Sequence, residues 1–258
     1  MALRDERGRI IIGGGIDPNW VASIAITTEP TNTQYAGNDL DLTGLVITAT
    51  KRDGTTEVVT NKVICNREKW GKAVPTTVTF GYKEKACYWT VTPTAVIPTS
   101  ATVKTAPTKV AYKYGEDIDL TGCVLEVTYN DSHKAEKGAS ALTVSPTTMG
   151  ADTASVTISY TEGETTVSAT QAVTLVAPDS ASVKTPATKL TYTAGEDVDL
   201  AGLVVEVTYD DGSKKDVGAD DLTAVPEVIA SDTTSITVTY TEGNVSVSTG
   251  YDITVTEG

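Results

Sequence analysis

The chain has 258 residues, of which 21% are charged and 40% hydrophobic, and its net charge is −14. These values fit a soluble globular chain and argue against general disorder. The negative charge disfavours nucleic-acid binding, which needs a basic face that displaces counterions, and no run approaches the ~20 apolar residues of a membrane span. We therefore expect neither nucleic acid nor membrane among the partners.

The first expected element is an arm over residues 1–19, which is too short to fold alone. Such a segment either frays or orders on a partner by adding a strand or lying in a groove. Gly13-Gly14-Gly15 reads as a flexible joint, because the Lys-Ser/Thr of a phosphate-binding loop does not follow it. Only three Ile are consecutive, so no signal peptide is expected and synthesis in the cytoplasm is predicted, unless a leader has been removed. The candidate docking residues of the arm are Arg4, Arg7, Arg9, Ile10, Ile11 and Ile12.

The rest of the chain repeats itself. One phrase begins at Gly37 as G-N-D-L-D-L-T-G-L-V, recurs from Gly115 as G-E-D-I-D-L-T-G-C-V, and recurs again from Gly195 as G-E-D-V-D-L-A-G-L-V. A second phrase, T-V-T-F, T-I-S-Y and then T-V-T-Y, keeps the same spacing of about 80 residues. Two markers on one period predict three copies of a small domain. They are copy one (20–96), copy two (97–177) and copy three (178–258).

Within a copy the hydrophobic period is two, which is the period of a half-buried β-strand. In copy three, apolar residues occupy every second position from Leu203 to Tyr209 and again from Ile236 to Tyr240. Turn signals such as Asp211-Gly212 separate about six to seven such segments in each copy. We therefore predict an all-β chain of three tandem immunoglobulin-like β-sandwiches preceded by a short N-terminal arm.

The repeated phrase also predicts local structure. Its two apolar positions are two residues apart, so both are expected to point into the core while the Asp residues between them face water. The glycine that ends the aspartate-containing stretch is expected where the chain bends between strands. Cys123 replaces the Leu of the other copies and is predicted to be a small buried hydrophobe. The apolar positions are Leu40, Leu42, Ile118, Leu120, Val198 and Leu200, and the glycines are Gly44, Gly122 and Gly202.

These phrases resemble the bacterial immunoglobulin-like repeat, most closely its group 3 type, over about nine tenths of the chain. Copy one is the most divergent, with A-T-K in place of the V-T-Y strand of the other copies. The resemblance implies a sandwich that is used in surface adhesins, cell-wall enzymes and phage virion proteins, and it implies no catalytic residues. In copy three it rests on Tyr192, Gly195, the D-L-A-G-L stretch from Asp199, Tyr209, Asp211-Gly212 and Tyr240.

Side chains suited to chemistry are few, and we predict no enzyme. His133 is the only histidine, which leaves no partner for a metal pair and predicts an exposed turn residue. Cys65 and Cys87 either form a disulfide or remain reduced thiols. One acidic pair recurs in each copy, for which the readings are bound calcium or the solvent side of a strand. No other cofactor is expected. The acidic pairs are Asp39/Asp41, Asp117/Asp119 and Asp197/Asp199.

The copies differ most in charge and in aromatic content. The net charge is +1 over residues 1–96, −4 over 97–177 and −11 over 178–258, and all three Trp lie in the first segment. Aromatic residues and Arg are favoured at protein interfaces, so we predict that residues 1–96 dock on a partner. The alternative is that aromatic side chains such as Trp89 and Tyr82 simply fill the first core. The predicted docking residues outside the arm are Trp20, Trp70 and Tyr88.

A chain of this kind predicts a holding, spacing or display role. Our main hypothesis is a bacteriophage virion protein, made in the host cytoplasm, that docks on a capsid or tail protein as a head decoration, head fibre or tail component. Copies two and three then project outward and bind host cell-surface glycans weakly, helped by avidity. The alternative is a bacterial cell-surface adhesin or stalk fragment, and a third reading is a carbohydrate-binding piece of a wall-active enzyme. Homo-oligomerisation is left open.

Overall fold

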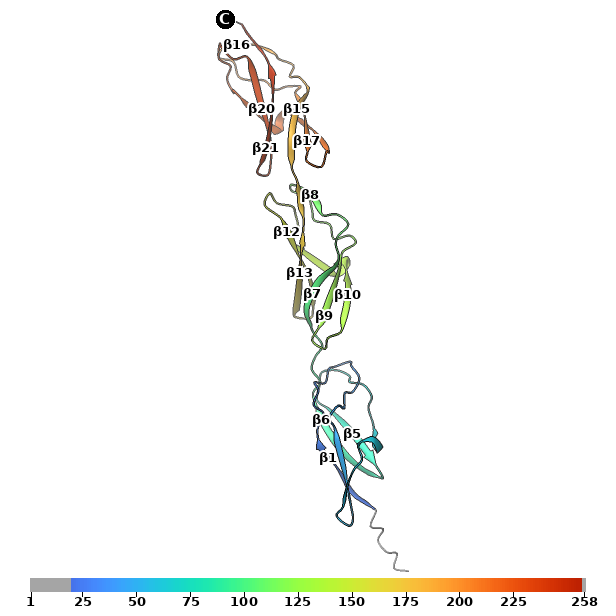
Figure 1. Ribbon diagram of the computed structural model, residues 1–258. Coiled ribbons are helices and arrows are strands. Elements are labelled where there is room, and N and C mark those ends of the chain that lie inside the picture. The colour runs from blue at the N-terminus through green and yellow to red at the C-terminus, as the bar shows by residue number, and fades with distance from the viewer. Residues whose placement is uncertain (1–19, 257–258) are drawn as a thin grey trace, which may run out of the picture. The chain divides into compact units, whose positions relative to one another are not determined.

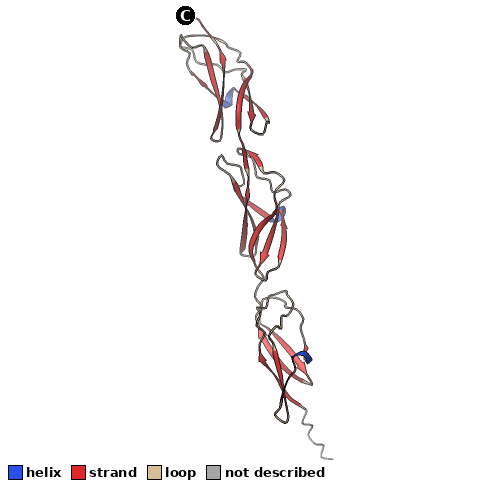
Figure 2. Cartoon of the chain, viewed as in Figure 1, coloured by secondary structure: helices blue, strands red, loops and turns tan. Residues whose placement is uncertain are grey.

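The computed structural model describes residues 20–256, and these residues are all-β. Strands and loops run throughout, with only single-turn 3₁₀ helices between them (Figure 1, Figure 2). The predicted class of tandem immunoglobulin-like β-sandwiches is confirmed, whereas the predicted arm lies outside the described residues. The chain divides into two compact units, Met1–Ile97 and Pro98–Gly258. No helix of the described part is long and apolar enough to cross a membrane.

Copy one lies in the first unit and consists of two three-stranded antiparallel sheets with orders β1-β2-β3 and β4-β5-β6. An isolated parallel bridge joins Tyr35 to Thr94. The elements are β1 (Val21–Thr28), β2 (Val46–Lys51), β3 (Thr56–Val58), η1 (Thr60–Lys62), β4 (Ile64–Cys65), β5 (Thr76–Tyr82) and β6 (Lys85–Val91).

Copies two and three lie in the second unit and share one topology. Each has two three-stranded antiparallel sheets, β7-β9-β10 with β11-β12-β13, and β15-β17-β18 with β19-β20-β21. In each copy, a short early strand also pairs in parallel with the last strand, β8 with β14 and β16 with β22. The elements of copy two are β7 (Pro98–Thr105), β8 (Ala111–Lys113), β9 (Val124–Tyr129), β10 (Lys134–Gly138), η2 (Ala139–Ala141), β11 (Leu142–Ser145), β12 (Ser155–Glu162), β13 (Thr165–Ala172) and β14 (Thr174–Val176). Those of copy three are β15 (Pro178–Thr185), β16 (Thr191–Thr193), β17 (Val204–Tyr209), β18 (Lys214–Gly218), η3 (Ala219–Asp221), β19 (Leu222–Val225), β20 (Ser235–Glu242), β21 (Val245–Asp252) and β22 (Thr254–Thr256).

The period-two pattern places one side of each main strand in a core. In copy three, Val205 and Val207 of β17 and Ile236 and Val238 of β20 are all at most 1% exposed and belong to one cluster. Full burial of an aliphatic side chain of this size stabilises a fold by about 1.5–3 kcal/mol. Cys123 is 1% exposed, which confirms its predicted role as a small buried hydrophobe.

The repeated phrase forms a tight turn. Gly202 has a positive φ of +80°, and a Cβ built there would lie 2.8 Å from Cγ2 of Thr188. Thr188 donates both its amide and its hydroxyl to the carbonyl of Ala201, at 2.9 and 3.0 Å. The carboxylate of Asp199 accepts the amide of Ala201 at 2.9 Å, which gives this Asp a local structural role that the alternation of the strand did not predict. The calcium reading of the acidic pairs stays a prediction.

A buried tyrosine holds the same turn in copies two and three. The hydroxyl of Tyr112 donates to the carbonyl of Lys109 at 2.8 Å and accepts the amide of Asp119 at 3.1 Å. In copy one this position is Gln34, whose side chain bridges the amide and the carbonyl of Asp41 at 3.1 and 2.8 Å. The amide side chain therefore takes over the hydrogen bonds of the tyrosine, but it leaves the volume of the ring to be filled by another residue.

The two cysteines of copy one do not pair. Cys65 and Cys87 both face Phe80, one from each side, so they stand two strands apart in the same sheet. With about 4.8 Å between neighbouring strands, their Cα atoms are about 10 Å apart, beyond the range that a disulfide spans. Both are free thiols, and Cys87 is buried while Cys65 is partly exposed.

We predict that a thiol reagent labels the native chain quickly at one position at most. Burial raises the pKa of the Cys87 and Cys123 thiols, which lowers the fraction of reactive thiolate as well as access to it. The measurement is labelling by an aromatic disulfide with and without denaturant, and the unfolded chain should titrate three thiols. A Cys65→Ser variant should lose the fast phase. Two fast thiols in the native chain would contradict the burial of Cys87.

Candidate interaction surfaces

The predicted docking residues fall into three groups. Those of the arm, Arg4, Arg7, Arg9 and the Ile10–Ile12 run, lie outside the described residues. Trp20 precedes β1 and is 53% exposed, and Tyr88 on β6 is 66% exposed. Trp20 and Tyr88 are therefore accessible to a partner, and their role in docking stays a prediction.

Trp70 is a correction to the sequence-based expectation, because its side chain is only 3% exposed and belongs to the core of copy one. Its indole Nε1 donates to Oε1 of Gln34 at 2.8 Å, and its ring meets that of Trp89 edge-on at 5.9 Å between centroids. Trp70 occupies the place of Met149 in copy two, since the amides of both bond to equivalent carbonyls, those of Asn38 and Glu116. The large indole thus fills space that Gln34 leaves empty.

Copies two and three are joined by side-chain contacts within the second unit. Nζ of Lys113, on β8, lies 3.7 Å from the ring centroid of Tyr209, at the end of β17. A cation above an aromatic face is attracted by about 0.5–2 kcal/mol, depending on its desolvation. The backbone amide of Asp210 also donates to the carbonyl of Ala177 at 3.0 Å, which ties the start of the next turn to the segment between the copies.

A second contact of this junction involves the β20–β21 turn. A Cβ built on Gly243 would lie 2.8 Å from Cδ2 of Tyr114, so the tyrosine ring and the glycine are closely packed. Nδ2 of Asn244 donates to Oδ1 of Asp152 at 3.2 Å. The sequence analysis identified neither Lys113 nor Tyr114. Both differ from their equivalents in copy three, which are Thr193 and Ala194.

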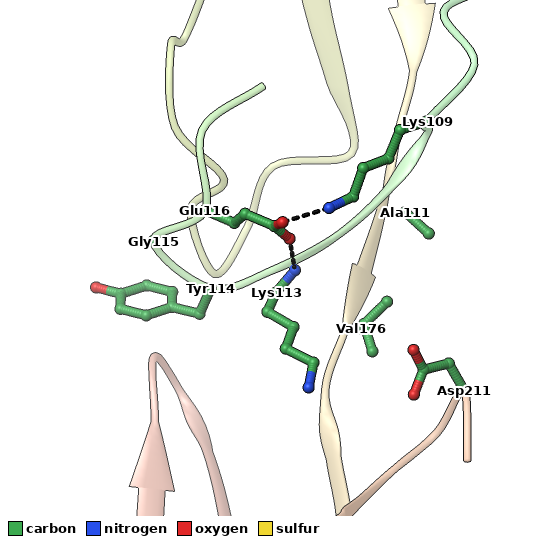
Figure 3. A pocket seen from close by; sticks show the side chains of 8 residues that line it. All are labelled: Lys109, Ala111, Lys113, Tyr114, Gly115, Glu116, Val176 and Asp211. Carbon is green, nitrogen blue, oxygen red and sulfur yellow. Dashed lines mark hydrogen bonds and ion pairs between the residues drawn. The ribbon is translucent and has the colours of Figure 1, made fainter. Parts of the chain in front are cut away.

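A pocket of about 460 Å³ opens at this junction (Figure 3). Its polar groups are bonded to one another, because Glu116 accepts the ammonium of Lys109 and, at 3.0 Å, the amide of Lys113. Asp211 accepts the amide of Ser213 at 2.8 Å. The pocket is therefore a space between copies two and three. The charged groups that line it already have partners within the chain, so they do not indicate a ligand. It is lined by Lys109, Ala111, Lys113, Tyr114, Gly115, Glu116, Val176 and Asp211.

A cluster of two tyrosines and a glutamate ties the two sheets together in copy two. Tyr129 of β9 and Tyr160 of β12 both donate to the same carboxylate oxygen of Glu162, at 2.6 and 2.8 Å. These two hydrogen bonds lower the pKa of Glu162. Nζ of Lys137 lies 4.5 Å from the centroid of the Tyr160 ring and completes the cluster. Copy three has the same arrangement, built from Tyr209, Tyr240, Glu242 and Lys215.

This cluster predicts a loss of stability in alkali. Burial, followed by the hydrogen bond to Glu162, raises the pKa of Tyr129 to about 12 from an ordinary value near 10, and burial also raises that of Tyr209. Between these values the unfolded chain releases the phenolic proton while the folded chain keeps it, so the free energy of unfolding falls as pH rises from about 10 to 12. Urea titrations of the second unit within the full chain, followed by far-UV dichroism, measure the effect.

The matched control is Tyr129→Phe, which cannot ionise. Its free energy of unfolding should fall less steeply over the same pH interval, although it starts lower because Glu162 loses one donor. An equal slope in both proteins would show that Tyr129 ionises normally in the folded chain.

Basic side chains are paired differently in the two units. After Ile97, every Lys lies within 4.0 Å of a carboxylate, except Lys113, which lies over the Tyr209 ring. In copy one, by contrast, several cations have no carboxylate of the described residues within that distance. They are Arg52, Arg67, Lys72, Lys83 and Lys85.

No protein-family model matches the chain, and no curated protein matches it. Similar solved structures include domains 4–9 of the surface layer protein SbsC, with 15% identity over 92% of this chain and 48% of that one, at a TM-score of 0.21. The eight N-terminal immunoglobulin domains of Down Syndrome Cell Adhesion Molecule match with 12% identity over 92% of this chain and 37% of that one, at a TM-score of 0.29. The I9–I11 tandem from titin matches with 9% identity over 91% of this chain and 100% of that one, at a TM-score of 0.28. The chain thus spans about half or less of the first two.

Proposed function

We propose that the chain is a non-enzymatic structural protein in which copy one docks on a larger assembly and copies two and three act as a spacer that is displayed from it. The observation that carries the proposal is a difference in how surface basic side chains are paired, because copy one differs in this from copies two and three although all three share one fold. Copies two and three place every basic side chain except Lys113 within 4.0 Å of a carboxylate, whereas copy one leaves five without a carboxylate partner among the described residues. Cations whose charge is not neutralised by a neighbouring carboxylate attract an acidic partner more strongly.

The contacts between copies two and three support the spacer half of the proposal. Lys113 over Tyr209 and Tyr114 against Gly243 join the two sandwiches beyond the covalent link between them. A spacer needs such contacts, because domains joined by a bare linker move independently. The hydroxyl-rich strands of these copies suit a solvated surface, and weak glycan binding by them stays part of the proposal.

The finer proposal is that the assembly is a virion, with residues 1–96 on a capsid or tail protein. A bacterial cell surface is the other setting in which an adhesive or stalk protein of this design would work. The test is to raise an antibody to the second unit and to fractionate a producing culture into density-purified particles and cell envelopes. We expect the chain in the particle fraction at a fixed ratio to its main coat protein. Recovery only with envelopes would overturn the virion setting, and recovery only as free protein would overturn the structural role.

A further inference from the structure

The outward side of the β4-β5-β6 sheet in copy one has an uncommon composition. Gly81 in the middle strand has Ile64 opposite it on one side and Ala86 on the other. Tyr88 stands two residues further along β6, opposite Thr79. Ile64 is 79% exposed and Tyr88 is 66% exposed, so two large side chains flank a glycine that has none. We call the set Ile64, Thr79, Gly81, Ala86 and Tyr88 the Tyr88 face.

In copies two and three the positions of Gly81 and Ala86 carry hydroxyls. Gly81 and Ala86 correspond to Thr161 and Thr166 in copy two, whose hydroxyls bond at 2.8 Å. In copy three they correspond to Thr241 and Ser246, which bond at the same distance. The hairpin therefore does not require Gly81 and Ala86 at these positions, because copies two and three form the same strand pairing with hydroxyl-bearing residues.

Tyr88 likewise stands where the other two copies have a residue with a hydroxyl group. Its positions in the other copies are held by Ser168 and Ser248, which bond across the sheet to Ser159 and Thr239. An aromatic side chain that is two-thirds exposed gains little for the fold, because most of its apolar surface stays in water. Tyr is one of the residues that contribute most to binding at protein interfaces, so an exposed Tyr88 is suited to contact a partner.

The hairpin end next to the Tyr88 face is basic, although its two lysines do not lie on the face itself. Lys85 begins β6 on the same side as Cys87. Lys83 lies in the turn from β5 to β6, with its Nζ 5.4 Å from the ring centroid of Tyr82. Neither has a carboxylate of the described residues within 4.0 Å, in a chain whose net charge is −14. Glu84 is the one acid in that turn. A partner that places carboxylates near this turn gains attraction, and a basic partner is repelled.

We propose that the Tyr88 face is the surface by which copy one holds its partner, and that the partner is a protein that seats an apolar side chain over Gly81 and presents Asp or Glu to the adjoining hairpin end, where Lys83 and Lys85 lie. This inference rests on the proposed docking role of copy one and names the surface that performs it. A Cβ at Gly81 would meet only two backbone carbonyl oxygens, at 3.9 and 4.0 Å, so the space over Gly81 is open to such a side chain. The two lysines set the charge at the hairpin end beside it.

The test uses the full chain, made in the cells that normally produce it, with the photo-cross-linker p-benzoylphenylalanine at position 88. Matched controls carry it at positions 168 and 248, the equivalent places in copies two and three. After irradiation of the intact assembly, we expect one discrete adduct from position 88 and none from the other two. Mass spectrometry should place the cross-link in a partner segment that has an apolar residue next to at least one Asp or Glu.

Two further variants probe the face and the hairpin end beside it. Gly81→Thr installs the residue of copies two and three in the gap, and Lys83→Glu with Lys85→Glu reverses the charge. Each should lower the yield of the position-88 adduct by about tenfold or more, while the fluorescence of buried Trp89 shows that copy one stays folded. Unchanged yields in both variants would overturn the proposal.

Other outcomes are equally decisive. Adducts only with another copy of the chain would replace the acidic partner by self-association, and adducts from all three positions would show nonspecific contact. A chain that co-purifies with the assembly but gives no adduct at position 88 would end this inference and leave the structural role standing. A chain absent from every assembly would instead end the proposed function.

Discussion

Trp70→Ala should lower the free energy of unfolding of copy one by about 3–5 kcal/mol, the cost of removing a large buried aromatic side chain from a core. Trp70 is 3% exposed, contacts Trp89 edge-on and donates to Gln34. Domains of this size are stable by about 5–15 kcal/mol, so the variant loses a large part of the total. The measurement is a urea titration followed by tryptophan fluorescence, which reports on copy one alone because every Trp lies there.

The control is Trp20→Ala, which removes the same side chain from a position that is 53% exposed. It should change the free energy of unfolding by about 0.5 kcal/mol or less. A second test rebuilds the arrangement of copy two by combining Gln34→Tyr with Trp70→Met. The pair should be more stable than the sum of the two single changes implies, because each residue occupies volume that the other leaves. Additive single effects would show that Gln34 and Trp70 are not packed as one unit.

Gly202→Ala should destabilise copy three by about 2–5 kcal/mol, as the sum of a backbone cost and a packing cost. A residue with a Cβ pays roughly 1–2 kcal/mol to adopt the left-handed conformation, and Gly202 has φ +80°. The added Cβ would also stand 2.8 Å from Cγ2 of Thr188, whose hydroxyl is held by the carbonyl of Ala201. Overpacking of this kind typically costs about 1–3 kcal/mol. Thermal or urea unfolding of the full chain, followed by far-UV dichroism, measures it.

Gly212 offers a matched control within the same copy. It has the same φ of +80°, but a Cβ there meets nothing within 4 Å. Gly212→Ala should therefore show the backbone cost alone, and Gly202→Ala should exceed it. Thr188→Ser, which removes Cγ2 and keeps the hydroxyl, should recover part of the loss when combined with Gly202→Ala. Equal costs at the two glycines would show that Thr188 moves aside without penalty.

The turn at Gly202 could be predicted from the sequence only in part. The sequence predicts a bend at Gly202, because the phrase that contains it recurs three times with glycine at the same place. It does not predict that Thr188 closes over that glycine, since the two residues are neighbours only through a hydrogen bond between separate segments. Tertiary contacts of this sort have no local signal.

Copy one shows where the sequence-based interpretation was wrong and why. Trp70 was assigned to a docking surface on composition, because it lies in a segment rich in aromatic and basic residues. The structure buries it, since Gln34 stands where the other copies have a tyrosine and leaves space for an indole. Comparison of the three copies position by position would have raised this alternative, because the loss of a large residue at one position and the gain of one at another are both visible in the repeats.

The amino-acid sequence is sufficient to predict the fold class, the threefold repeat and the buried side of the main strands, which includes Val205, Val207, Ile236 and Val238. These follow from a period of two and from turn residues, which act over a few neighbouring positions. The tertiary structure alone decided that Cys65 and Cys87 stand two strands apart, that Lys113 reaches Tyr209, and that Ile64, Gly81 and Tyr88 share one exposed face. Strand register and the packing of one sandwich on the next bring these residues together, and both depend on contacts between segments distant in the chain.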